Sequence, residues 1–127
     1  MSSILYVEDD DLTRQSVGNR LRRLGHDVTA VASGEAALQV ARDIHPVLAL
    51  LDLELPGING IETLKRLRQW LPTLPVIICS AHLNECMCRQ LEELGIPSGH
   101  LLCKPVRFSA ISVAVASALV LPTTKLE

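Results

Sequence analysis

The sequence predicts an α/β fold, with one doubly wound sheet of five parallel strands and helices on both faces. Short apolar segments alternate with segments whose apolar residues recur every three to four positions, as in helices. Strands separated by helices imply parallel pairing through right-handed crossovers. The chain has 127 residues, 48% of them hydrophobic, which is enough for one domain with a sizeable core.

The strands are expected at five short apolar segments. These are residues 4–7, 28–32, 47–53, 76–79 and 101–103. The third is almost wholly apolar, which is typical of a strand covered by helices on both faces.

Four helices are expected between these strands, each with an apolar stripe of helical spacing. The stripes are Val17, Leu21 and Leu24; Ala37, Val40, Ala41 and Ile44; Ile61, Leu64 and Leu67; and Met87, Leu91 and Leu94. Gly25 is expected to end the first helix and Ser33 to cap the second. Asp10 or Asp11 should lie at the start of the first helix, where the helix dipole favours a negative charge.

A fifth helix is expected over residues 107–120. It completes a single domain, residues 1–120, and residues 121–127 are expected to be a disordered tail or a remnant of an expression vector. Residues 108–124 contain no charged side chain. The stripe that should pack on the sheet is Phe108, Ile111, Val115 and Leu119.

The opposite side of this helix should expose an uncharged face. Its residues are Ser109, Val113, Ser117 and Val120. A soluble helix normally carries charges there, so we expect this face to bind a second copy of the chain or an output domain. The alternative is that small Ala and Ser residues make the face harmless without any partner. A membrane span is not expected, because an uncharged helix of about 14 residues is about 21 Å long and the hydrocarbon layer is about 30 Å thick.

Composition argues against nucleic-acid binding and secretion. The balance of 12 basic and 14 acidic residues gives a net charge of −2, and the three aromatic residues offer little for stacking on bases. No signal peptide is recognisable. The cysteines match no zinc pattern, so a reduced, cytoplasmic protein is expected. Cys79 and Cys103 lie in apolar segments and are expected to be buried.

Polar residues stand where the predicted strands end, at the carboxyl edge of the sheet, where open α/β sheets bind ligands. They are Glu8, Asp9 and Asp10 after the first strand, Asp52 at the third, Ser80 after the fourth and Lys104 after the fifth. Each has an ordinary explanation on its own, as a solvated turn, a helix cap or a surface charge. Asp52 is the exception. A charge at the end of a buried strand costs on the order of several kcal/mol of folding free energy unless a cation lies nearby.

These residue types together are suited to phosphoryl chemistry. Asp9, Asp52 and the backbone carbonyl of Glu54 can hold Mg²⁺, and Glu8 can bind it through water. Lys104 can pair with Asp52 and then with a phosphoryl group, and Ser80 can donate to a phosphoryl oxygen. An aspartate carboxylate is an established covalent acceptor of phosphate.

Four segments of the chain resemble the receiver domains of bacterial two-component response regulators, which are related to the chemotaxis response regulator. The segments are residues 4–10, 50–60, 75–81 and 104–105. The resemblance implies a flavodoxin-like (βα)5 sheet with strand order 2-1-3-4-5. It also implies that Asp52 is the phospho-acceptor, Glu8 and Asp9 are the acidic pair that binds Mg²⁺, and Ser80 and Lys104 complete the site.

The same resemblance implies partners and a switch. Such domains take phosphate from a histidine kinase or a histidine phosphotransfer protein. Phosphorylation then changes a face made of the fourth helix, the fifth strand and the fifth helix. Leu101 stands where the family often has an aromatic switch residue, and Glu54 and His82 occupy the two variable positions beside the phosphate. The alternative for His82 is an exposed loop residue.

Two other classes of protein also fit parts of the pattern. A haloacid-dehalogenase-type phosphatase uses an aspartate nucleophile, but it requires a second Asp where this chain has Glu54, and its cap domain has no room here. A receiver-like domain that binds partners without phosphate is the other alternative. The complete set of Asp52, Ser80 and Lys104 argues against it.

Overall fold

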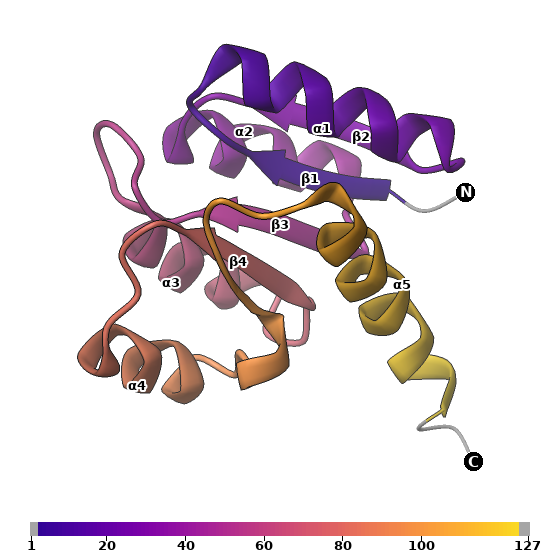
Figure 1. The fold of residues 1–127 in the computed structure, drawn as a ribbon. Coiled ribbons are helices and arrows are strands. Elements are labelled where there is room, and N and C mark those ends of the chain that lie inside the picture. Colours follow the sequence, from indigo (N-terminus) through magenta and orange to yellow (C-terminus); the bar gives the residue numbers. More distant parts are fainter. Residues whose placement is uncertain (1–2, 125–127) are drawn as a thin grey trace.

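The computed structural model describes residues 3–124, with side chains described up to residue 119. It confirms the predicted fold, a parallel five-stranded sheet of order β2-β1-β3-β4-β5 (Figure 1). The strands are β1 (Ser3–Val7), β2 (Asp27–Val31), β3 (Leu48–Asp52), β4 (Val76–Ser80) and β5 (Leu101–Cys103). The helices are α1 (Asp11–Arg23), α2 (Gly34–Ile44), α3 (Gly60–Trp70), α4 (Glu85–Glu93) and α5 (Phe108–Thr124), with a 3₁₀ turn η1 at Ser98–His100.

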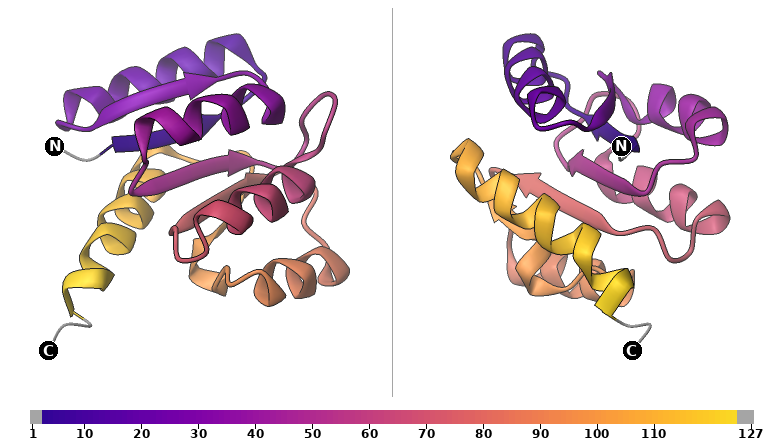
Figure 2. Two further views of the ribbon diagram at one scale, coloured as in Figure 1. Left: turned by 180° about the vertical axis from the view of Figure 1, so that it is seen from behind. Right: turned by 90° about the vertical axis from the view of Figure 1, so that its right-hand side faces the viewer.

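The sheet separates two apolar cores, because successive side chains of a strand point to opposite faces. In β1, Leu5 and Val7 join the core beneath α2, α3 and α4, whereas Ile4 and Tyr6 join the core beneath α1 and α5. Figure 2 shows α1 and α5 on one side of the sheet and α2 and α3 on the other. Every residue of β3 is buried, as predicted for a strand that is covered on both faces.

Four of the helices are capped at their N-termini by side chains that offer an oxygen acceptor. Asp10, Ser33, Asn59 and Asn84 each accept a hydrogen bond from the backbone N–H three residues later. Asp10 is therefore the cap of α1, and hydrogen bonds from the hydroxyl and the backbone of Thr13 lower its pKa. These caps fix where each helix leaves the carboxyl edge of the sheet.

Two predicted burials are wrong. Leu24 is 56% exposed, because α1 ends at Arg23 and Leu24 is the residue that caps it rather than part of the packed stripe. Cys103 is exposed, because β5 is an edge strand with a neighbour on one side only. Cys79 on the more central β4 is buried, as predicted.

The last helix packs as predicted but is longer. Ile111 and Val115 are buried, and Phe108 and Leu119 pack against the core beneath α1 and α5. The helix runs to Thr124 rather than to residue 120, so the predicted tail begins within it; residues 125–127 lie outside the described residues.

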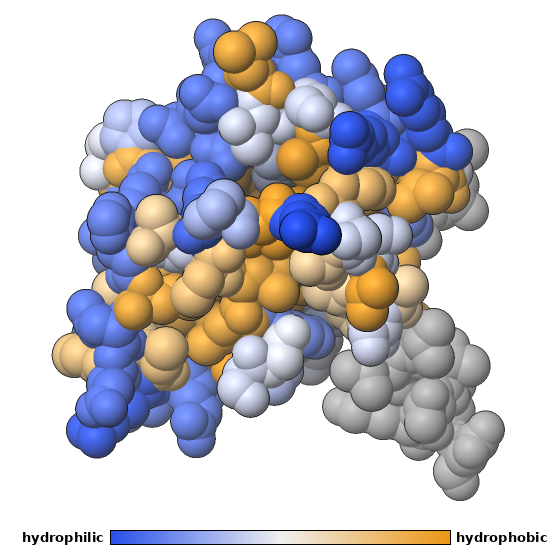
Figure 3. Space-filling model, in the orientation of Figure 1, coloured by the Kyte–Doolittle hydropathy of each residue, from blue (hydrophilic) through white to orange (hydrophobic). Residues whose placement is uncertain are grey.

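The outer face of α5 is uncharged. Ser109, Val113 and Ser117 are exposed, and the side chain of Val120 lies outside the described part. Figure 3 shows pale and orange residues along the described part of α5, whereas hydrophilic residues dominate over α1. Among the described residues, no helix is long and apolar enough to cross a membrane.

Candidate functional site

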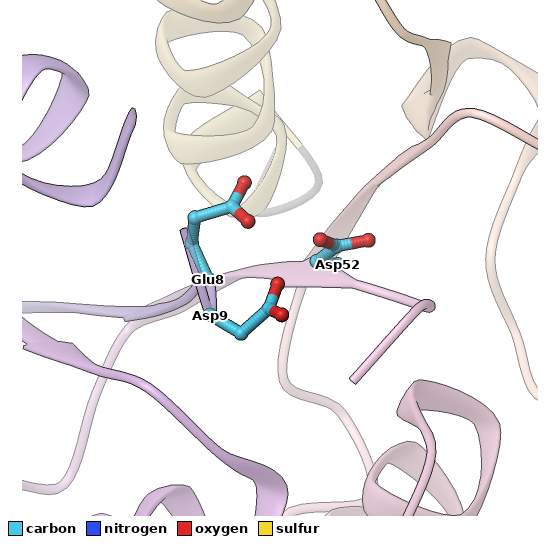
Figure 4. A group of neighbouring side chains, drawn as sticks. All are labelled: Glu8, Asp9 and Asp52. Atoms are coloured by element: carbon cyan, nitrogen blue, oxygen red, sulfur yellow. The ribbon is translucent and has the colours of Figure 1, made fainter. Parts of the chain in front are cut away.

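Three carboxylates meet at the carboxyl edge of the sheet. Glu8 and Asp9 directly follow β1, and Asp52 is the last residue of the adjacent strand β3. One oxygen from each lies within 4.8 Å of the others, around one small space (Figure 4). Glu8 and Asp52 are buried, with 2% and 4% of their surface exposed, whereas Asp9 is exposed. The sequence prediction that these acids lie together is confirmed.

Lys104 supplies the cation that the buried Asp52 requires. Its Nζ donates to Asp52 Oδ2 at 3.0 Å and to Glu8 Oε1 at 2.8 Å. Its backbone N–H donates to the carbonyl of Ser80 at 2.8 Å, which places the side chain over the ends of β1 and β3. Burial lowers the pKa of Lys104, but its hydrogen bonds to Glu8 and Asp52 outweigh that effect and raise it. The ammonium group therefore stays charged at neutral pH.

One ammonium does not neutralise three carboxylates. With Glu8, Asp9 and Asp52 ionised, this group keeps two uncompensated negative charges beside Lys104. Burial raises the pKa of Glu8, and the hydrogen bond from Lys104 offsets only part of that rise. The site is therefore electrostatically suited to a further cation.

Ser80 and Glu54 form a second part of the site, on the side of β4. Ser80 is fully buried at the end of β4, and its Oγ donates to Glu54 Oε2. Glu54 Oε1 accepts the backbone N–H of Ala81 at 2.9 Å. The backbone N–H of Glu54 donates to Asp52 Oδ1 at 3.0 Å, so the turn after β3 links this part of the site to the acids.

The sequence pointed to the backbone carbonyl of Glu54 and missed the contacts of its side chain. An acid two residues beyond the end of β3 can reach the end of β4, because Asp52 pairs with Cys79 across the two strands. The pairing of β3 with β4 would have indicated this contact, but the order of residues alone does not show which residues of the two strands lie side by side.

Three other residues that were named from the sequence, His82, Leu101 and His100, lie outside the cluster of three carboxylates. The side chain of His82 is exposed, and its backbone N–H donates to Ser80 Oγ at 3.2 Å. Leu101 is partly buried against the core beneath α2, α3 and α4. The ring of His100 is hydrogen-bonded to the carbonyl of Val76, at the start of β4 and far from the carboxyl edge.

Gly60 fixes the turn that follows Asp52 at the end of β3. Its N–H donates to the carbonyl of Leu53 at 3.0 Å, so α3 begins directly against the end of β3. A Cβ atom at this position would lie 2.5 Å from the backbone oxygen of Asp52, a distance at which atoms must move. Only glycine allows this close approach.

Comparison with known proteins agrees with this geometry. Residues 4–116 match the model of the response regulator receiver domain family. The chain is 35% identical over 121 residues to the transcriptional regulatory protein AfsQ1 of Streptomyces coelicolor, covering 94% of this chain and 52% of that protein. It is 32% identical over 116 residues to the two-component response regulator PhoP of Pseudomonas aeruginosa, covering 91% and 51%.

Solved structures show the same fold. A response regulator receiver domain protein from Methanospirillum hungatei superimposes with a TM-score of 0.92 at 22% identity, covering 98% of both chains. The signal receiver domain of a modulated diguanylate cyclase from Desulfovibrio desulfuricans gives 0.84 at 28% identity, again covering 98% of both.

The chain spans about half the length of the curated relatives AfsQ1 and PhoP. The part that matches is the part that carries Glu8, Asp9, Asp52 and Lys104. This match decides against the haloacid-dehalogenase-type alternative. The chain belongs to the response regulator receiver domain family, and it is a receiver domain, a signalling module, of two-component signal transduction.

Proposed function

We propose that Asp52 accepts a phosphoryl group from a histidine kinase or a histidine phosphotransfer protein, and that this switches the face formed by α4, β5 and α5. The observation that carries the proposal is a buried carboxylate at the carboxyl edge, 3.0 Å from a charged lysine and next to two further acids. The carboxylate of Asp52 is 4% exposed, and the hydrogen bonds that it accepts from Lys104 Nζ and from the backbone N–H of Glu54 hold its orientation.

The donor set fits Mg²⁺. Glu8, Asp9, Asp52 and the backbone carbonyl of Glu54 are all oxygen donors, which hard cations prefer, and the acids carry the uncompensated charge that a cation would balance. When bound, the ion would neutralise charge on the phosphoryl oxygens. The three carboxylates typical of receiver Mg²⁺ sites are thus present, and we assign them this role.

The residues around Asp52 would perform the transfer mainly by positioning and charge. An oxygen of Asp52 forms a bond to phosphorus while the bond from phosphorus to the donor breaks, and the donor keeps that electron pair. Lys104 stays protonated and stabilises the negative charge at the new acyl phosphate. The hydroxyl of Ser80 donates to a phosphoryl oxygen. The wholly buried β3 behind Asp52 keeps water from that side.

Phosphorylation is tested with acetyl phosphate and Mg²⁺, followed by intact-mass measurement. We expect the wild type to gain the mass of one phosphoryl group and Asp52→Asn to gain none. Asp43→Asn, an exposed aspartate on α2, is the matched control and should behave as the wild type does. If Asp52→Asn gained the same mass, the acceptor would be another residue and the proposal would be wrong.

The outer face of α5 is the candidate contact for a partner. Its exposed residues Ser109, Val113 and Ser117 are uncharged, and Val113 is 69% exposed. We propose that a second copy of the chain or an output domain covers this face. No role in binding nucleic acid or membrane is proposed for it.

A further inference from the structure

The carboxylate of Glu54 holds two hydrogen-bond donors at the end of β4. Ser80 Oγ donates to one of its oxygens, and the backbone N–H of Ala81 donates to the other at 2.9 Å. Glu54 reaches them from the turn after β3, across the gap between the two neighbouring strand ends. Both donors therefore face the side of β4 on which Asp52 lies.

These donors are the ones that a phosphoryl group on Asp52 would need from this side. An acyl phosphate presents three strongly accepting oxygens, and one of them can be satisfied by Lys104. Ser80 and Ala81 follow Cys79, the pairing partner of Asp52 in β4, so they are the next donors along the carboxyl edge. In the unphosphorylated protein, an anionic side chain already occupies both.

We propose that Glu54 is an internal substitute for the phosphoryl group, which holds Ser80 and Ala81 until Asp52 is phosphorylated and is then displaced into solvent. The inference rests on the proposed phosphorylation of Asp52. A carboxylate resembles a phosphoryl group in charge and in its accepting oxygens, so one can replace the other on the same donors. Glu54 is exposed, so its carboxylate can return to water without moving the backbone.

Two consequences follow for the reaction and the fold. Glu54 competes with the incoming phosphoryl group, so it lowers the affinity of the site for any phosphoryl mimic. It also anchors the start of the loop from Ala81 to Asn84, which leads into α4, before any phosphate is present. When acetyl phosphate is the donor, an oxygen of Asp52 bonds to phosphorus and acetate leaves with the electrons of the broken P–O bond. Glu54 takes no part in this bond exchange, and only its hydrogen-bond partners change.

The competition is tested by titrating beryllium trifluoride, a non-covalent phosphoryl mimic, in the presence of Mg²⁺. Glu54→Ala frees both donors, and we expect it to bind the mimic about tenfold more tightly than the wild type, the change typical of one charged hydrogen bond. Glu54→Gln keeps one accepting oxygen and should fall between the two. Glu85→Gln, an exposed acid in the first turn of α4, removes the same charge without touching either donor and should leave the affinity within about twofold.

The anchoring is tested by NMR on the protein without Mg²⁺ or mimic. Loss of the carboxylate acceptor should move the Ala81 amide proton upfield in Glu54→Ala and should speed amide hydrogen exchange over residues 81–84. Glu85→Gln should change neither signal. Because this measurement needs no phosphoryl chemistry, it tests the contact independently of the proposed function.

The outcomes separate the two proposals. Equal affinity of the wild type and Glu54→Ala for beryllium trifluoride, with an unmoved Ala81 amide, would overturn the inference about Glu54. A wild type that neither binds the mimic nor becomes phosphorylated would overturn the proposed function, while the Ala81 signal still reports on Glu54. A Mg²⁺ affinity that falls about tenfold in Glu54→Ala would assign its carboxylate to the metal and would also overturn the inference.

Discussion

Cys79 illustrates how much the position of a single residue determines its chemistry. It is 7% exposed on β4, and burial raises the pKa of its thiol to about 12. Cys86 and Cys103 are exposed. Since the thiolate is the reactive form, we expect iodoacetamide at pH 8 to label Cys86 and Cys103 in the folded protein and Cys79 only after denaturation. Peptide mapping by mass spectrometry measures this, and rapid labelling of Cys79 in the native protein would contradict the packing of β4.

The thiol of Cys79 also makes the free energy of unfolding depend on pH in the alkaline range. In the unfolded chain Cys79 should ionise near its ordinary pKa of 9.0, whereas in the folded protein it does so only near 12. Between these values the folded state binds more protons than the unfolded state, so the contribution of Cys79 to the free energy of unfolding decreases as the pH rises.

At the level of residues, the sequence predicted which groups gather but not how each side chain is bonded. Asp52 required a cation, and Lys104 at the end of another strand was the available one. That Lys104 also binds Glu8, and that Glu54 turns toward Ser80, depend on side-chain torsions and on strand register. Neither can be read from residue order.

Among the elements, the junction of β3 with α3 is the one where packing and site depend on each other. Gly60→Ala would place a methyl group 2.5 Å from the backbone oxygen of Asp52. We expect a loss of about 1–3 kcal/mol in the free energy of unfolding, as for overpacked cores, and slower phosphorylation because Asp52 moves. Urea denaturation and intact-mass kinetics measure the two effects.

Gly99 offers the matched control for this substitution. A Cβ atom there meets nothing within 4 Å, and the residue is exposed in η1. Gly99→Ala should change stability by no more than about 0.5 kcal/mol and leave phosphorylation unaffected. Equal behaviour of the two variants would show that the close approach at Gly60 does not constrain the site.

The order and type of the five strands and five α-helices could be predicted, because the spacing of apolar residues and the turn residues depend on local sequence. The 3₁₀ turn η1 was not predicted. The ends of the elements, and the burial of residues at those ends, were less predictable. Gly25 has a φ of +96°, which suits the left-handed backbone just beyond a helix, so α1 stops before Leu24 can join its stripe. Cys103 sits in an apolar segment like that of Cys79, but it is exposed because β5 lies at the edge of the sheet, a position that the apolar pattern alone does not show.

For the molecule as a whole, the uncharged face of α5 is the feature that predicts assembly. If this face joins two copies, Val113→Glu would bury a charge in the contact and weaken self-association at least about tenfold without unfolding the protein. Sedimentation velocity over a range of concentrations measures this, with and without acetyl phosphate. Leu12→Glu, which replaces an apolar residue 79% exposed on α1, is the control and should have no effect. A wild type that stays monomeric at every concentration would leave docking of an output domain as the role of this face.

The hydrogen bonds of Lys104 also have a consequence for folding during synthesis. This side chain joins Glu8 and Asp52, which precede it by 96 and 52 residues. A chain emerging from the ribosome presents both acids long before their counter-charge exists. Glu8 and Asp52 therefore gain this counter-charge only when Lys104, directly after the last strand β5, has been added, so the end of the sheet is the last part of the site to be made.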